Sequence, residues 1–179
     1  MISATLSDAQ YGLLFGVRRS IRYHDRRRAF FEQLHRLTSA LTILLAGSVF
    51  FDLAKPGDTA PWLLWVSAGA AALAALDMVV GYSTRATQHR ELKGRFVALE
   101  MAMLDGGNDD EAWRRHHRAR LAIERDEPPI YRALDCLCHN ELLAAEGMRR
   151  DKHPEDYASL TPWQQFTSQW LHWADLGPG

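Results

Sequence analysis

Two apolar segments, 37–53 and 61–82, lie a few residues apart and constrain the fold more than any other feature of the sequence. At a helical rise of about 1.5 Å per residue, 61–82 is long enough to cross a hydrocarbon core of roughly 30 Å. Residues 59–76 carry no formal charge, and Asp77 is the only charged residue between them and Arg85. Aromatic residues near both ends are typical of membrane interfaces: Trp62, Trp65 and Tyr82. The sequence therefore predicts a membrane-spanning helix at 61–82.

The segment 37–53 is shorter, at the lower limit for crossing a bilayer. Its hydroxyl side chains can bond back to their own helix: Thr38, Ser39, Thr42 and Ser48. A buried helix of a soluble domain is the alternative interpretation. However, a single span at 61–82 would leave the arginines of the chain on opposite sides of the membrane. We therefore expect 37–53 and 61–82 to form a transmembrane hairpin.

Basic residues outside the hairpin indicate its orientation. They precede the first segment and follow the second: Arg18, Arg19, Arg22, Arg26, Arg27, Arg28 and Arg36, then Arg85, Arg90, Lys93 and Arg95. The connecting loop contains only Lys55 among basic residues, and Lys55–Asp58 predicts a tight turn. Because basic residues favour the cytoplasmic side, we expect both termini in the cytoplasm of a bacterial cell and the turn outside. This topology explains the basic cluster, so we expect no nucleic-acid partner.

Outside the hairpin the sequence predicts only helices. The expected fold is therefore an all-α membrane protein, a two-helix transmembrane hairpin with a cytoplasmic helical bundle. Its expected parts are an N-terminal helix, the hairpin, a cytoplasmic helical region and an aromatic tail: 1–36, 37–82, 83–150 and 151–179. After the second span, helix should continue through Met103 and stop at Asp105–Asn108.

Cap signatures predict three further helices. Asp109 or Asp110 is expected to cap a helix, and Pro129 to open the next. A last helix should begin with a capping box made by Thr161 and Gln164, with proline at its first position.

Asp77 is the first candidate functional residue, because an ionisable side chain within a span is costly. It shares a small, polar helix face with four residues at 3,4 spacing: Ser67, Ala70, Ala74 and Gly81. Such a face packs closely against another helix or lines a water-filled path. In a symmetric hairpin Asp77 lies level with Leu37, within reach of Arg36 or His35. Structural pairing and a pore-lining role both remain open at this point.

Two apolar stripes suggest contacts between helices or subunits. The first is Leu92, Phe96, Leu99 and Met103, and the second is Trp163, Phe166, Trp170 and Trp173, expected on one helix. The aromatic stripe can lie among lipid headgroups or pack on the bundle or a neighbouring subunit. Its scarcity of basic residues favours packing. With the small-residue face of the second span, these stripes predict a homo-oligomer.

Two polar clusters are interpreted as structural. Cys136, Cys138 and His139 offer too few ligands, at an unusual spacing, for zinc, and we expect no metal or other cofactor. Acidic residues around a Pro-Pro bend alternate with arginines and resemble a salt-bridged surface: Glu124, Asp126, Glu127, Asp135 and Glu141. No nucleophile–base set is recognisable, so we expect no enzyme activity. Acid–base chemistry at the Pro-Pro bend is the enzymatic alternative.

Short motifs spread over roughly Arg18–Glu146 resemble those of one family. They are Arg19-Ser20-x-Arg22-Tyr23-His24, Arg27, Phe30-Phe31, His89, Leu92, Phe96, Ile123-Glu124-x-Asp126-Glu127-Pro128-Pro129, Tyr131-x-Ala133-Leu134 and His139-Asn140-Glu141. In these motifs the chain resembles the SLATT family. Members of that family are bacterial proteins with two membrane spans, encoded beside nucleotide-producing or nucleotide-sensing partners in conflict systems. The resemblance implies a pore-forming effector that damages the inner membrane in antiphage defence.

The same resemblance implies a separate trigger. No sensor domain is recognisable in this sequence, so we expect a separate sensor or nucleotide-synthesising protein as partner. The tail after Asp151 lies outside the matched motifs. The alternative is a membrane anchor or scaffold that recruits a cytoplasmic partner and forms no pore.

Overall fold

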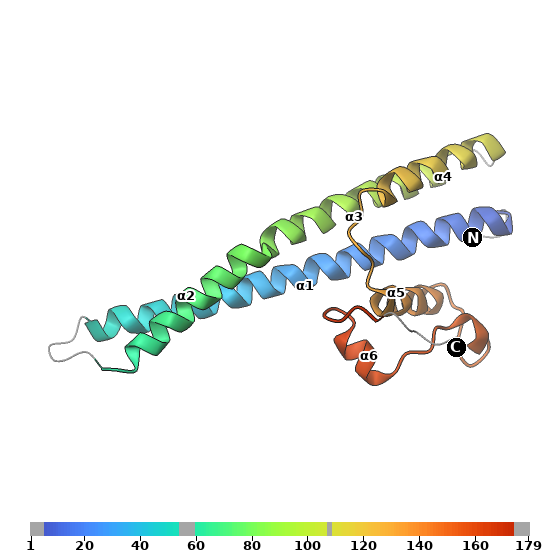
Figure 1. Ribbon diagram of the computed structural model, residues 1–179. Coiled ribbons are helices and arrows are strands. Elements are labelled where there is room, and N and C mark those ends of the chain that lie inside the picture. The colour runs from blue at the N-terminus through green and yellow to red at the C-terminus, as the bar shows by residue number, and fades with distance from the viewer. Residues whose placement is uncertain (1–5, 54–59, 107–108, 174–179) are drawn as a thin grey trace. The chain divides into compact units, whose positions relative to one another are not determined.

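The computed structural model describes residues 6–53, 60–106 and 109–173, and within these ranges it contains helices and no strands. The helices are α1 (Asp8–Leu53), α2 (Leu63–Val80), α3 (Tyr82–Asp105), α4 (Asp110–Glu124), α5 (Arg132–Ala145) and α6 (Pro162–Thr167), with a 3₁₀ turn at Pro154–Asp156 (Figure 1). The predicted all-α fold is confirmed. The predicted Lys55–Asp58 turn lies outside the described residues.

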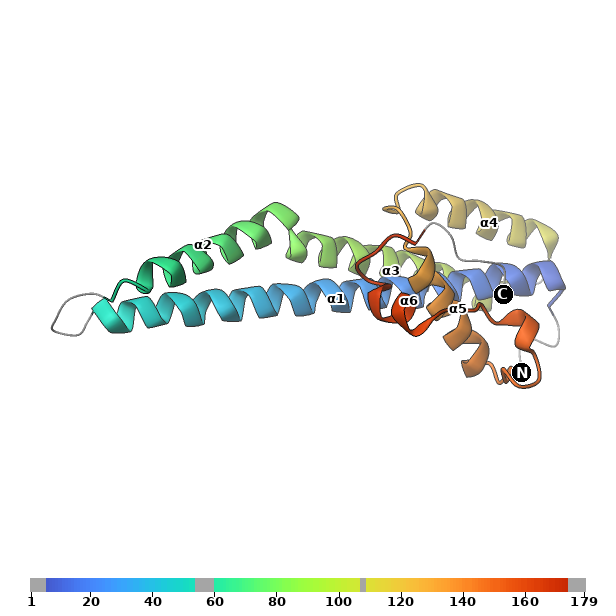
Figure 2. The same cartoon turned by 60° about the horizontal axis from the view of Figure 1, so that its bottom comes forward.

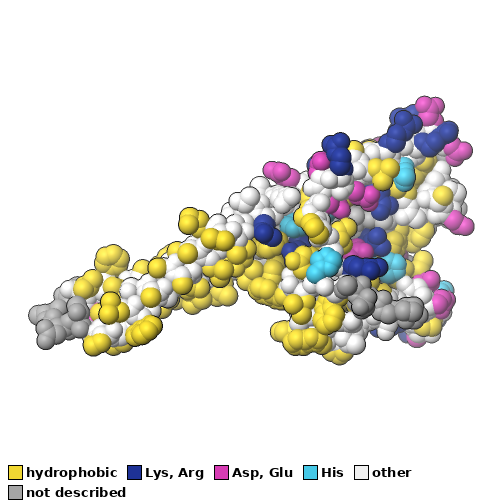
Figure 3. All heavy atoms as spheres, in the orientation of Figure 1, with side chains coloured by type: hydrophobic (Ala, Val, Ile, Leu, Met, Phe, Trp, Pro, Cys, Tyr) yellow, Lys and Arg dark blue, Asp and Glu magenta, His cyan; other side chains and the backbone are white. Residues whose placement is uncertain are grey.

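The chain forms two compact units. The terminal unit comprises Met1–Arg27 and His89–Gly179, and the central unit comprises Arg28–Gln88. Both α1 and α3 contribute residues to each unit. Figure 3 shows hydrophobic side chains along α1 and α2, whereas most charged side chains lie over elements of the terminal unit.

In the central unit, α1 and α2 run side by side (Figures 1 and 2). Buried and partly buried positions at 3,4 spacing run along both helices, which is the seam expected of two packed helices. These positions are Phe31, His35, Thr38, Thr42, Leu45 and Val49 on α1, and Leu63, Val66, Ala70, Leu73, Asp77 and Val80 on α2. Gly69 lies on the same side, since a Cβ added there would be 3.9 Å from Leu45 Cδ1.

The outward faces of these helices are apolar and exposed. Ile43, Phe50, Trp65 and Val79 are each at least 70% exposed. Within the most apolar 18-residue window, only 6% of α1 and 11% of the α2–α3 stretch is buried. A core helix of a soluble domain would be mostly buried, and these two segments are not. Both helices are long and apolar enough to cross a membrane.

Gly81 interrupts the helix that was expected to run on from the second span. Its φ of 65° is left-handed, and its N–H donates to the Asp77 carbonyl, which is the usual way a helix ends at glycine. Gly81 is therefore the C-cap of α2 and not a member of its small-residue face. Beyond it, Tyr82 and Ala86 of α3 pack on Phe31 of α1.

The core of the terminal unit is built from α1, α3 and α4. Leu14 and Val17 of α1 pack with Trp113 and Ile123 of α4 and with four residues of α3: Leu92, Phe96, Leu99 and Met103. These four are between 0% and 6% exposed within a single chain. Their assignment to a subunit interface was therefore wrong, because the stripe finds its partners inside the same unit.

Of the three predicted helix starts, two are confirmed and one is wrong. Asp109 caps α4 by accepting from the Ala112 N–H, and Thr161 with Gln164 forms the predicted capping box of α6. In contrast, α5 begins at Arg132 rather than after Pro129, because the backbone of Tyr131 is extended, with φ −80° and ψ 102°. The Tyr131 N–H donates to the Tyr23 hydroxyl, with the two atoms 3.0 Å apart.

The aromatic tail is less helical than its spacing predicted. Because α6 ends at Thr167, Trp170 and Trp173 lie beyond it, and the single four-residue helical stripe is wrong. Trp163, Phe166 and Trp170 are 60%, 75% and 58% exposed, while Trp173 Nε1 donates to Thr167 Oγ1.

Candidate functional site

The central unit pairs the one ionisable residue of α2 with a histidine of α1. His35 Nδ1 lies 2.9 Å from Asp77 Oδ2, and the two side chains are 43% and 23% exposed. Of the two partners expected for Asp77, the structure brings His35 to it and leaves Arg36 exposed. With Nδ1 protonated, the imidazole donates to the carboxylate. A protonated histidine makes the pair electrically neutral overall, which lowers the cost of placing it in an apolar medium.

A groove of about 390 Å³ opens beside this pair. Hydroxyl residues of α1 line one wall, and small or polar residues of α2 line the other: Thr38, Ser39 and Thr42, then Ala74 and Asp77. The Thr38 hydroxyl donates to the Leu34 carbonyl, so it is satisfied within its own helix.

The predicted small-residue face of α2 is only partly buried. Ala70 is buried in the seam and Asp77 is half-buried, whereas Ser67 and Ala74 are exposed. The Ser67 hydroxyl donates to the Leu64 carbonyl of the same helix. Two small residues are thus left on an exposed flank of α2.

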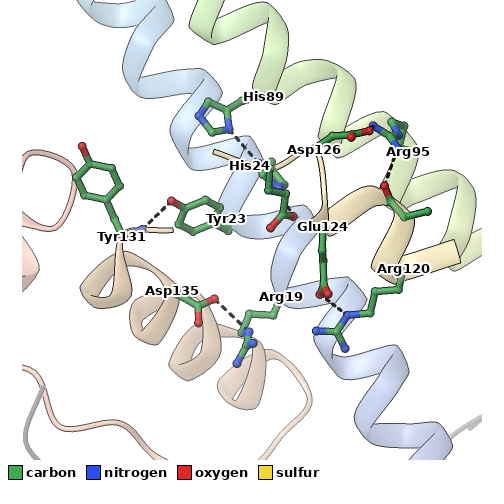
Figure 4. Close-up of polar contacts among 12 residues, drawn as sticks. Arg19, Tyr23, His24, His89, Arg95, Arg120, Glu124, Asp126, Tyr131 and Asp135 are labelled. Atoms are coloured by element: carbon green, nitrogen blue, oxygen red, sulfur yellow. Dashed lines mark hydrogen bonds and ion pairs between the residues drawn. The ribbon is translucent and has the colours of Figure 1, made fainter. Parts of the chain in front are cut away.

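A second polar cluster, missed by the sequence-based interpretation of the acidic residues, lies in the terminal unit. His24 is fully buried, with its Nδ1 2.9 Å from His89 Nδ1 and its Nε2 3.0 Å from Glu127 Oε1 (Figure 4). The Glu127 side chain is only 7% exposed. Glu127 was expected on a solvated surface, and that expectation was wrong.

The packing around His24 fixes its ring. The imidazole stacks on Phe96 with centroids 5.6 Å apart, and Tyr23 meets it edge-on at 5.3 Å. Tyr23 also accepts the Tyr131 N–H, and burial raises the pKa of its hydroxyl. Helices α1 and α3 and the segment after α4 are therefore joined through one histidine.

The hydrogen bonds of this cluster are compatible with two protonation states of His24. Because two Nδ1 atoms 2.9 Å apart share one proton, one imidazole must donate and the other accept. A neutral His24 donates through Nε2 to Glu127 and accepts from His89, whereas a protonated His24 donates to both. The second state balances the buried carboxylate. Both states keep the His24–His89 and His24–Glu127 hydrogen bonds.

The other acids of this region are paired with arginines, as the salt-bridged interpretation predicted. The ion pairs are Glu124–Arg120, Asp126–Arg95, Asp135–Arg19 and Glu141–Arg26. The Arg95 guanidinium lowers the pKa of Asp126, whereas burial raises the pKa of Asp135.

The cysteine–histidine cluster serves packing and tail attachment. Cys138 packs with Tyr23 and Leu134, and burial raises the pKa of its thiol to about 12. His139 Nε2 lies 2.9 Å from the Asp156 carbonyl oxygen, and Asn140 bonds both backbone groups of Ala158. These bonds fasten the tail to α5.

Comparisons with known proteins return no match for this chain: no family model matches, and neither the curated proteins nor the solved structures contain a match. The geometry of the two polar clusters and the sequence motifs are therefore the basis for assigning a function.

Proposed function

We propose that this chain is a homo-oligomeric inner-membrane effector that opens a polar path across the bilayer, as its resemblance to the SLATT family implies. The supporting observation is the His35–Asp77 pair beside a hydroxyl-lined groove, set between two helices whose remaining surface is apolar and exposed. Ionisable groups within spans commonly mark ion or proton pathways.

One hairpin cannot enclose a conducting path, because each spanning helix satisfies only its own backbone, and a polar channel needs several subunits around it. The proposal therefore needs a contact between copies. Ser67 and Ala74 leave an exposed, small-residue flank on α2. Small residues allow close approach of helices within a membrane. This flank replaces the Leu92–Met103 stripe as the candidate contact.

In the proposed topology, 37–53 and 61–82 form the hairpin and both termini are cytoplasmic. The His35–Asp77 pair holds α1 and α2 together in the closed state. Opening exchanges this intrachain pair for an arrangement in which Asp77 faces the path. A separate sensor or nucleotide-synthesising protein is the proposed source of the trigger. The proposal assigns no enzyme activity to the chain.

A membrane anchor that recruits a cytoplasmic partner is the second candidate. It is favoured by the pairing itself, because His35 already satisfies Asp77 within one chain. In that case the pair has only a structural role, and the groove is a packing defect between two helices.

Induced expression in bacteria with a membrane-potential dye separates the two. Under the effector proposal the wild type depolarises the cells, and Asp77→Asn abolishes depolarisation while membrane insertion, measured by carbonate extraction, is unchanged. Asp52→Asn is the matched control, since it removes another acid of the apolar helices outside the groove lining. Depolarisation that is equal in wild type and Asp77→Asn would rule out a path built on Asp77. Full insertion without depolarisation, also when the genomic neighbours are co-expressed, would favour the anchor.

A further inference from the structure

A pocket of about 750 Å³ lies within the terminal unit, between the first turns of α1 and the helix α4. This volume falls in the range of small-molecule sites. Its walls include Gly12 and Leu13 of α1 and Trp113, Arg118 and Arg120 of α4. The pocket is separate from the His24 cluster and from the central unit.

Gly12 lines the α1 side of the pocket, and Gly16, one helical turn further along α1, lies against the lining residue Arg120. A Cβ added at Gly16 would lie 2.5 Å from Arg120 Nη1, so the missing side chain allows the guanidinium to rest against the helix. A Cβ added at Gly12 would meet nothing within 4 Å. Glycine within a helix costs about 1 kcal/mol relative to alanine. Close helix packing accounts for Gly16, but at Gly12 the missing side chain leaves open space.

The charge of the lining is predominantly positive. Three arginines and a histidine face a single acid among the lining residues: Arg114, Arg118, Arg120 and His117 against Asp110. Arg120 is held by Glu124, with Nε 2.6 Å from Oε1, which fixes its guanidinium toward α1. Arginine presents donors in a planar fork that suits phosphate and carboxylate oxygens.

The apolar wall of the pocket contains Trp113, whose indole N–H is a hydrogen-bond donor. Trp113 is only 6% exposed, and its Nε1 has no hydrogen-bond partner in the part of the chain that the structure describes. A buried donor without a partner is costly, and such cases call for a missing acceptor. Leu13 contributes a further apolar surface.

We propose that this pocket binds a small organic oxyanion, a phosphate or carboxylate attached to an aromatic or apolar group. The arginines and Trp113 Nε1 bind the oxyanion, and the ring of Trp113 with Leu13 binds the apolar part. The open position at Gly12 admits the ligand. This inference is independent of pore activity and of the hairpin topology.

Isothermal titration calorimetry on the full chain in phosphatidylcholine nanodiscs tests it, with empty nanodiscs as blank. Phenyl phosphate and benzoate are the probes, and phenol is the uncharged comparison. We expect saturable binding of at least one anion and none of phenol. The ratio of the two affinities distinguishes a phosphate site from a carboxylate site.

Three variants locate the binding. Gly12→Phe should abolish it by filling the open space, Arg118→Ala should weaken it at least fivefold, and Arg115→Ala should leave it unchanged. Arg115 is the matched control because it lies on α4, pairs with Glu111 and is not part of the lining. Circular dichroism checks that each variant stays folded. Absence of saturable binding by both anions, or equal binding by wild type and Gly12→Phe, would overturn the proposal.

Discussion

The two units both contain a histidine bonded to a carboxylate, but in opposite surroundings. In the terminal unit, His24 and Glu127 have side chains 1% and 7% exposed and are enclosed by Phe96 and Tyr23. In the central unit, His35 and Asp77 are 43% and 23% exposed at the edge of a groove. A buried pair stabilises a fold because the loss of one partner leaves the other buried without a hydrogen bond. A pair at a groove can separate at a lower cost in free energy, because water can solvate both groups. The first therefore suits a structural role and the second a moving part.

Glu127→Ala is expected to have the largest effect on stability. It removes the acceptor of His24 Nε2 in a buried site and should cost about 3 kcal/mol of unfolding free energy. Guanidinium unfolding of the full chain measures the loss. Alkylation of Cys138, in a Cys136→Ser background, reports opening of the terminal unit specifically, because Cys138 is fully buried there.

Asp126→Ala is the control for this prediction, since it deletes the neighbouring carboxylate, which is exposed and paired with Arg95. It should change stability little. If both variants unfold at the same denaturant concentration, burial of Glu127 does not stabilise the terminal unit, and the contrast between the two pairs fails.

Substitution of the two glycines with positive φ should have the next largest effect on stability. Gly81 has a φ of 65° and Gly147 a φ of 86°, one in each unit. Alanine at either position should cost about 1–2 kcal/mol, because a Cβ is strained in the left-handed region. Gly81→Ala should leave Cys138 protected from alkylation, whereas Gly147→Ala should expose it faster. Equal alkylation rates in the two variants would mean that the units do not unfold separately.

Structure that depends on neighbouring residues could be predicted from the sequence, whereas contacts between distant residues could not. The caps at Asp109 and Thr161 and the apolar length of α2 follow from neighbouring residues, so they could be predicted. Periodicity showed that Leu92–Met103 has a buried face, but not that its partners lie in α1 and α4 of the same chain. The burial of Glu127 depends on His24, which is 103 positions away in the sequence. No pattern among the neighbours of Glu127 predicts it. The motif resemblance includes both residues and was the only available signal.

The coupling between His35 and Asp77 should be smaller than that between His24 and Glu127. Hydrogen bonds between membrane helices average about 0.6 kcal/mol and reach at most about 1.7 kcal/mol. A double-mutant cycle with His35→Gln and Asp77→Asn, read by thermal unfolding in detergent, measures it. The same cycle with His24→Gln and Glu127→Gln provides the comparison. A larger coupling for His35–Asp77 would reverse the assignment of structural and mobile pairs.

The smallest expected effect is the pH dependence contributed by Asp109. Its carboxylate accepts the Ala112 N–H at the start of α4, and this hydrogen bond lowers its pKa below the ordinary value for aspartate. Because the folded pKa lies below the unfolded one, Asp109 stabilises the terminal unit above the unfolded pKa. This contribution is lost as pH falls through the folded pKa.

Asp109→Asn isolates this contribution, because asparagine caps a helix about as well as aspartate but does not titrate. Helical melts followed by circular dichroism between roughly pH 6 and pH 3 should show a steeper loss of stability for the wild type than for Asp109→Asn. The difference should be greatest at the upper end of this range and shrink on acidification, since a protonated aspartate is the weaker acceptor. Parallel curves would mean that the cap is not charge-assisted. The change should appear in the terminal unit alone, because the central unit contains neither Asp109 nor α4.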